Sequence, residues 1–152
     1  MRQLAKRRTF QAAIAATVVA APTAQAGTWK VDDNCDVPSI SCSYDDLWMN
    51  YNSAEYAVKD GKVLSAATTY YGNVYDHWGT SRHQGSTLDT YRYVFGYDTS
   101  GNGYGQYMKN NAASVRNCAP DDGYAVYYNS GYGGASQYFK PEGGWGAART
   151  AT

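Results

Sequence analysis

Tyrosine and glycine are distributed in a way that restricts the fold more than any other feature of the sequence. All 16 tyrosines and all 16 glycines of the 152-residue chain follow Ala26. Tyrosine favours strands, glycine favours turns, and turn-forming residues recur about every ten positions. Leucine and alanine show no helical periodicity in this part of the sequence. The sequence therefore predicts an all-β chain of short strands joined by turns.

Three segments have the clearest strand pattern, and each ends at a turn signal. In residues 91–97 the aromatic side chains alternate, which places them on one face of a strand. Residues 124–128 run into Asn-Ser-Gly and residues 47–51 run into Asn-Ser, and both sequences favour turns. We expect all three segments to be strands.

Residues 1–26 have the features of an export signal. Four cations within residues 2–8 precede an apolar stretch over residues 12–21, and Ala24-Gln25-Ala26 offers a small-residue cleavage site. We expect cleavage before Gly27, which leaves one secreted, extracellular domain over residues 27–152. The arginine pair at residues 7–8 leaves the general secretory and the twin-arginine routes open. The apolar stretch is too short to span a bilayer, so no membrane partner is expected.

The charge balance changes when the export signal is removed. That segment carries four of the 13 cations and none of the 13 acidic residues, so nine cations remain against 13 acids. A mildly acidic domain lacks the basic surface that phosphate-backbone binding requires. Nucleic acid is therefore not an expected partner.

Cys35, Cys42 and Cys118 all lie in the exported part, where disulfides are expected. Three pairings are open. A bridge from Cys35 to Cys42 would contribute about 2.5 kcal/mol, and one from Cys42 to Cys118 about 4.5 kcal/mol. We favour the short bridge, because Cys42 and Cys118 begin two similar segments and equivalent positions need not touch. The sequence contains no Cys-x-x-Cys pair, so the cysteines do not indicate a zinc site.

The segments that begin at Cys42 and Cys118 share two aspartates and a Tyr-Asn-Ser sequence before a turn. In the second segment, four residues resemble the folded hairpin of βγ-crystallins: Tyr127, Tyr132, Gly134 and Ser136. Glycine there permits a backbone conformation that other residues avoid, and its missing side chain lets a ring lie across the hairpin. The first segment departs from this pattern, because Ala57 stands at the position that matches Gly134.

A second stretch strengthens the resemblance. Residues 109–117 resemble the serine-bearing strand of the same fold, and with Val-Tyr-Tyr-Asn-Ser they are similar to the actinobacterial family of secreted metalloproteinase inhibitors. The resemblance covers about residues 42–139 and implies a βγ-crystallin-like Greek-key β-sandwich that inhibits extracellular metallopeptidases without being an enzyme. It assigns no inhibitory loop. The expected last strand is missing from the sequence, so we expect a truncated final motif.

The resemblance also raises the question of calcium, the usual cofactor of such folds. The matching ligands would be Asn110, Asn111 and Ser114, preceded by Lys109. A lysine would repel the ion, and neutral amides bind calcium poorly compared with carboxylates. We therefore favour a structural turn and expect no cofactor.

The residues that commonly carry catalysis do not form a recognisable set. His77 and His83 are the only histidines, and their six-residue spacing with nearby Asp76 fits no recurring set of metal ligands. We expect both to be exposed loop histidines. No nucleophile motif and no opposed pair of carboxylates is evident. The sequence does not predict an enzyme.

Aromatic residues with polar tips offer the best candidate binding surface. Tyr70, Tyr71, Tyr75 and Trp78 cluster between the two similar segments and could form a binding loop, with packing in the core as the alternative. The favoured function is peptidase inhibition by a loop that occludes the partner. A secreted glycan- or cell-wall-binding module, or an antifungal toxin-like module of the same fold, is the alternative. The oligomeric state stays open.

Overall fold

The computed structural model describes residues 25–42, 47–53, 58–59, 62–96, 101–141 and 149–150. Most of the export signal and Ala57 lie outside these ranges. Of the segment that bears on a truncated final motif, residues 142–148 lie outside them, whereas residues 149–150 form a short strand. The described residues form a 3₁₀ turn η1 (Asn34–Asp36) and the strands β1 (Thr28–Val31), β2 (Leu47–Asn50), β3 (Val58–Lys59), β4 (Lys62–Val63), β5 (Ala67–Tyr70), β6 (Gly79–Gln84), β7 (Thr87–Tyr93), β8 (Ser114–Asn117), β9 (Tyr124–Asn129), β10 (Gly133–Phe139) and β11 (Arg149–Thr150). The predicted all-β class is confirmed for this part of the chain.

A four-stranded antiparallel sheet, which we call the body sheet, has the strand order β11, β8, β2 and β5. Every residue of β2, β5 and β8 is buried. Strand β8 lies beside β2 although β5, β6 and β7 come between them in sequence. The chain thus leaves the body sheet after β5 and returns to it at β8.

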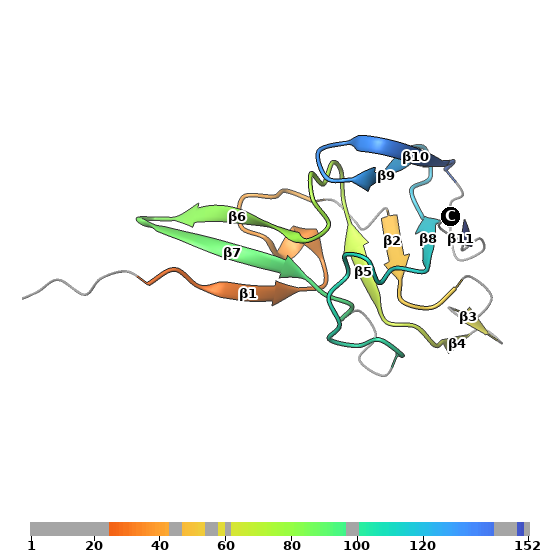
Figure 1. Cartoon of the computed structure of the whole chain (residues 1–152), viewed down its shortest axis with the longest axis horizontal. Helices are drawn as coiled ribbons and strands as arrows, with labels where there is room; N and C mark the ends of the chain where they lie inside the picture. The colour runs from red at the N-terminus through yellow and green to blue at the C-terminus, as the bar shows by residue number, and fades with distance from the viewer. Residues whose placement is uncertain are drawn as a thin grey trace, which may run out of the picture.

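The excursion between β5 and β8 contains most of a second sheet, which we call the arm. Strands β6 and β7 form an antiparallel hairpin, and β1 adds to the other side of β7 in parallel register. Figure 1 shows these three strands extending away from the rest of the molecule, with the turn between β6 and β7 at the far end. Two small two-stranded sheets, β3–β4 and β9–β10, complete the arrangement.

The core lies where the arm meets the body sheet. Its largest fully buried side chains are Tyr70, Tyr93, Phe95 and Met108. The rings of Tyr70 and Tyr93 meet edge to face, with centroids 5.1 Å apart. Aromatic pairs in this geometry contribute about 1 kcal/mol beyond the area they bury. The base of the arm is therefore part of the hydrophobic core.

The predicted strand over residues 91–97 is shifted in the structure. Strand β7 begins four residues earlier, at Thr87, and ends at Tyr93. Beyond that point the chain pairs with a different segment, since Phe95 N–H donates to Gln106 O and Met108 N–H donates to Tyr93 O. Tyr91, Tyr93 and Phe95 are all buried, as their alternation predicts. Tyr97 lies outside the described residues.

The two similar segments have different surroundings. The first contributes β2, which is buried in the centre of the body sheet. The second contributes β9, which pairs with β10 in a partly exposed hairpin. Both strands lie where the sequence predicted strands, but similarity of sequence does not give them equivalent places.

The β9–β10 hairpin contains the residues that resemble a folded hairpin. Gly134 has φ of +78°, and an added Cβ would lie 2.9 Å from Asn129 Nδ2. Tyr132 also has positive φ, +60°, and its ring contacts the Tyr127 ring with centroids 5.8 Å apart. Ser136 is the register partner of Tyr127, and the pairing shifts between Gly133 and Ser136. With Gly131, whose φ is +71°, this turn contains three residues in the left-handed conformation.

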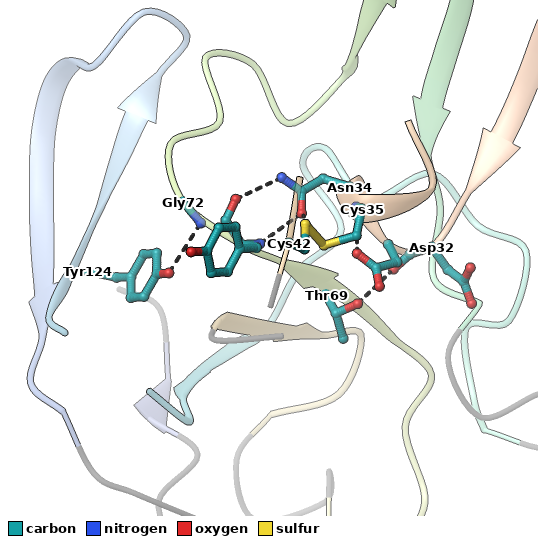
Figure 2. The surroundings of a disulfide bond; sticks show 9 residues. Asp32, Asn34, Cys35, Cys42, Thr69, Gly72 and Tyr124 are labelled. Carbon is teal, nitrogen blue, oxygen red and sulfur yellow. Dashed lines mark hydrogen bonds between the residues drawn. A yellow bond between two sulfur atoms is a disulfide. The ribbon is translucent and has the colours of Figure 1, made fainter. Parts of the chain in front are cut away.

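A disulfide joins Cys35 and Cys42, the pairing that the sequence argument favoured, and Cys118 is not part of it. Figure 2 shows Asn34 beside this bridge. The Asn34 side chain is buried and bonds both main-chain groups of Tyr71: its Nδ2 donates to Tyr71 O at 2.9 Å and its Oδ1 accepts from Tyr71 N–H at 2.7 Å. The segment that follows β1 is thereby fixed to the end of β5.

None of the described residues forms a helix that is long and apolar enough to cross a membrane.

Candidate functional site

The four residues predicted as a binding loop are separated in the structure. Tyr70 is only 1% exposed and belongs to β5, so its assignment to a binding loop is wrong. Successive side chains of a strand point to opposite faces, and the one at position 70 points into the core. Tyr71 is half-buried, whereas Tyr75 is 70% exposed and Trp78 39% exposed. Only the last two present substantial surface.

Trp78 belongs to a row at the base of the arm in which two neighbouring rings have a cation at each end. Its ring lies 5.1 Å from the Tyr107 ring, centroid to centroid. The Arg92 guanidinium lies 4.9 Å from the Trp78 centroid, and the Lys30 ammonium lies 5.2 Å from the Tyr107 centroid. Each cation–ring contact contributes about 0.5–1 kcal/mol at an exposed site. Because cations cover these rings, the row stabilises the arm more than it offers an open stacking platform.

The strand register explains why this row forms. Lys30 of β1 pairs with Arg92 of β7, and Arg92 pairs with Gly79 of β6. Gly79 has φ of +144°, and an added Cβ would overlap the Tyr91 carbonyl oxygen. Glycine is therefore required at the start of β6, directly after Trp78, where the chain enters the β6–β7 hairpin.

The distal part of the arm is the most exposed candidate surface. In β6, residues 80–83 alternate between half-buried and exposed. Residues 83–86, at the tip of the arm, are all exposed. His83 and Leu88 face each other across the hairpin near the tip, and Leu88 is 49% exposed. Within the described residues, no strand pairs with the outer edge of β6. An unpaired edge of this kind can accept an extended chain of a partner.

A cavity of about 1070 Å³ lies between the β9–β10 hairpin and the body sheet. Its apolar floor consists of Leu47, Met49, Met108, Val115 and Phe139, none of which is more than 4% exposed. Cavities of this size can hold a small molecule. These five side chains are almost fully buried, so they offer a ligand little accessible surface. We therefore do not place the candidate site here.

The rim of this cavity is closed by an ion pair that joins three segments. Lys109 Nζ donates to Asp76 Oδ1 at 2.9 Å and to Ser130 Oγ at 3.1 Å. Burial alone would raise the pKa of Asp76, but the Trp78 N–H, the Ser130 hydroxyl and the Lys109 ammonium favour the carboxylate, and the pKa lies below its usual value. The segment 71–78 is thus fastened to the β9–β10 hairpin.

His77 does not lie on an exposed loop, in contrast to the prediction, although His83 is exposed. The His77 ring packs edge to face on Tyr70, with centroids 5.2 Å apart. Burial lowers the pKa of His77, Lys109 lowers it further, and Asp76 opposes the shift. Among the described residues, neither His77 Nδ1 nor the Tyr70 hydroxyl has a hydrogen-bond partner. Burial also raises the pKa of Tyr70 well above its usual value.

The three calcium candidates do not share one environment. Asn110 is exposed with φ of +68°, as expected of a turn residue. The Asn111 side chain donates to Tyr107 O at 2.9 Å. Ser114 is fully buried, and its hydroxyl donates to Asn52 O at 2.7 Å. Within the described part of the chain, no group of three or more histidine, cysteine or acidic residues is arranged to hold a metal ion.

These features define an all-β protein with several small antiparallel sheets, a disulfide at the base of a projecting arm, and an exposed strand edge on that arm. Comparison with protein-family models, with curated proteins and with solved structures gave no match. Sequence reasoning did not find β6, because Gly-Thr-Ser-Arg-His-Gln has no apolar alternation. The only local signal was Gly85-Ser86, a glycine-containing two-residue turn between 79–84 and 87–93.

Proposed function

We propose that this protein is a secreted inhibitor of extracellular peptidases, that its targets are metallopeptidases, and that it acts by occlusion rather than by catalysis. The observation that carries the proposal is the projecting β6–β7 hairpin with its unpaired β6 edge. The choice of metallopeptidases rests on the sequence resemblance alone.

The shape of the arm suits insertion into a cleft. Six residues of extended strand span about 20 Å, which is long enough to fill several substrate subsites. A peptidase holds its substrate as an extended chain, and strand addition supplies main-chain hydrogen bonds without demanding particular side chains. The outer edge of β6 offers its N–H and C=O groups for this purpose.

The arm is also held in shape before it meets a partner. Strand β7 has a neighbour on each side, and the end of β1 is tied to the body through Thr69 N–H, which donates to Asp32 O at 2.8 Å. Next to it, Val94 N–H donates to Val31 O at 2.9 Å. A preorganised segment loses less conformational entropy on binding than a flexible one. Preorganisation also disfavours the rearrangements that productive cleavage of the arm would need.

The fold supports the same proposal at a coarser level. In the body sheet β8 returns after a long excursion to lie beside β2, as the last strand of a Greek key returns to lie beside its first, although the order β11, β8, β2 and β5 is not that of a complete Greek key. We include a βγ-crystallin-like sandwich in the proposal for this reason. In a β-scaffold of this kind, the long connection between β5 and β8 would carry the function, because binding residues commonly lie on such connections.

The test is a titration of the purified exported protein against a thermolysin-like metallopeptidase and a panel of serine peptidases. We expect stoichiometric loss of metallopeptidase activity. The double variant His83→Ala/Leu88→Ala removes two exposed side chains near the tip of the arm and should weaken inhibition at least about tenfold. The control Tyr128→Ala/Tyr138→Ala removes exposed side chains from the β9–β10 hairpin and should inhibit normally. Loss of inhibition in the control alone would move the site off the arm.

One observation favours a second candidate function, binding to glycans or cell walls. The β9–β10 hairpin exposes Tyr128 and Tyr138, which are 77% and 62% exposed, and its exposed Tyr132 ring contacts the Tyr75 ring, with centroids 6.0 Å apart. Exposed tyrosine rings can stack on sugars while their hydroxyls remain hydrated. Retention on insoluble glycans that the Tyr128→Ala/Tyr138→Ala variant loses and the arm variant keeps would favour this function over inhibition.

A further inference from the structure

The residue that follows the predicted export signal is bound at both of its main-chain polar groups. Gly27 N–H donates to Asp89 Oδ1 at 2.8 Å, and Gly27 O accepts from Thr90 N–H at 2.9 Å. Asp89 and Thr90 are neighbours in β7, so the pairing of β1 with β7 begins at this residue. We propose that export processing cuts between Ala26 and Gly27, and that the new α-ammonium of Gly27 pairs with Asp89 to fix β1 in the arm.

Gly27 marks the point at which the chain enters the arm. Gln25 and Ala26 are exposed, whereas Gly27 is half-buried. An added Cβ at Gly27 would lie 2.7 Å from Nε1 of the Trp29 ring, so glycine leaves space for this ring beside the chain terminus. The bond before Gly27 is therefore the last one that lies outside the arm.

Hydrolysis of that bond changes the chemistry of the contact with Asp89. Water adds across the Ala26–Gly27 amide, its oxygen leaves with the export signal in the Ala26 carboxylate, and both of its protons end on the Gly27 nitrogen. A neutral amide with one N–H thus becomes a cation with three, because α-amino groups are mostly protonated at neutral pH. The bond from the Gly27 amide to the Asp89 carboxylate already has a charged acceptor, and the cut adds a charge on the donor, so an ion pair replaces a contact between a charge and a dipole. The cut would therefore tighten a contact that is already formed.

One other cation lies close enough to compete for Asp89. Arg82 is the register partner of Asp89 in β6. Its Nη1, however, donates to Thr80 Oγ1 at 2.9 Å and to Ser81 O at 3.1 Å, within its own strand. The carboxylate oxygen Oδ1 of Asp89 accepts from Gly27. The geometry thus pairs Asp89 with the chain terminus.

The consequence for inhibition rests on the proposed function. Strand β1 supports one side of β7, and the β6–β7 hairpin projects from that support. Tighter fixing of the start of β1 would stiffen the arm more in the exported protein than in the uncut precursor. Maturation and activity would then be coupled through one ion pair at the outer end of β1.

The test begins with the full chain expressed in an exporting host. The intact mass of the secreted product should correspond to residues 27–152, and a different terminus would overturn the proposal. The product is then acetylated at its α-amine with limiting acetic anhydride at mildly acidic pH. We expect the Asp89→Asn variant to react about tenfold faster than the wild type, because the unpaired amine is more often deprotonated and exposed.

Two further variants make the result specific. Asp89→Glu keeps the carboxylate and should restore part of the protection, which shows that charge rather than local unfolding is measured. Asp121→Asn removes an exposed carboxylate far along the chain and should react as the wild type does. Equal reactivity of the wild type and Asp89→Asn, with unchanged near-ultraviolet circular dichroism, would overturn the pairing. None of these readouts depends on peptidase inhibition, so the two proposals can fail separately.

Discussion

At the scale of single residues, the buried His77 makes the stability of the fold depend on pH. Burial lowers its pKa, so the folded protein binds a proton at this site less readily than the unfolded chain. The unfolded chain therefore takes up more protons below about pH 6.5, the usual pKa of histidine. Stability that is fully present above that pH should be lost as the pH falls toward the folded pKa. We expect urea unfolding to show a falling free energy between pH 7 and pH 5.

His77→Gln should flatten this pH profile, because glutamine does not titrate. The charged groups that influence the ring are Asp76 and Lys109, which form an ion pair with each other. His83→Gln is the matched control, since His83 is exposed, and it should leave the slope unchanged. A wild-type slope in His77→Gln would show that another group causes the pH dependence.

At the scale of elements, Lys109 links the segment 71–78 to the tip of the β9–β10 hairpin. The Lys109 and Asp76 side chains are 36% and 28% exposed, so water screens their attraction. Lys109→Met should therefore destabilise the protein by only about 1 kcal/mol. The loss should shrink in 1 M salt, where the wild type loses the same attraction. Thermal unfolding at low and high salt measures both effects.

Lys140→Met gives the comparison for this prediction, because Lys140 is an exposed lysine just after β10. It should change stability little and show no salt dependence of its own. If Lys109→Met lost as much stability in high salt as in low salt, packing of the lysine stem rather than charge would hold the hairpin.

The elements also show which parts of the fold the sequence could predict. Strand β9 follows from a run of aromatic and β-branched residues that ends in Asn-Ser-Gly, and all of that information is local. Strands β1 and β6 have no such pattern, because what places them is their pairing with β7. Local sequence does not encode parallel pairing between residues 62 positions apart, such as Thr28 and Thr90. The arm, and with it the candidate site, was therefore missed.

The assignment of Tyr70 to a binding loop was wrong for a related reason. Two adjacent tyrosines look alike in an exposed loop and at the end of a strand. In the structure one side chain is buried against Tyr93, while the main chain of the next is bound by Asn34. Which side of the chain faces the core depends on the register of β5 with β2, and that register is a tertiary property.

At the scale of the whole molecule, the Cys35–Cys42 bridge lies where the arm joins the body. It closes a short loop between positions seven apart, which restricts the unfolded chain by about 2.5 kcal/mol in the loop-entropy description. The double variant Cys35→Ser/Cys42→Ser should lose about that much stability in urea unfolding. Cys118→Ser keeps the bridge and should lose less.

The same double variant separates two ways of holding the arm. The backbone bond from Thr69 to Asp32 and the Asn34 contacts with Tyr71 do not need the bridge, so β1 should remain paired with β7 when it is absent. Hydrogen exchange of the β1 and β7 amides should then become faster only as much as the loss of global stability requires. Selective loss of protection in β1 would instead show that the disulfide, and not the buried asparagine, positions the arm for binding.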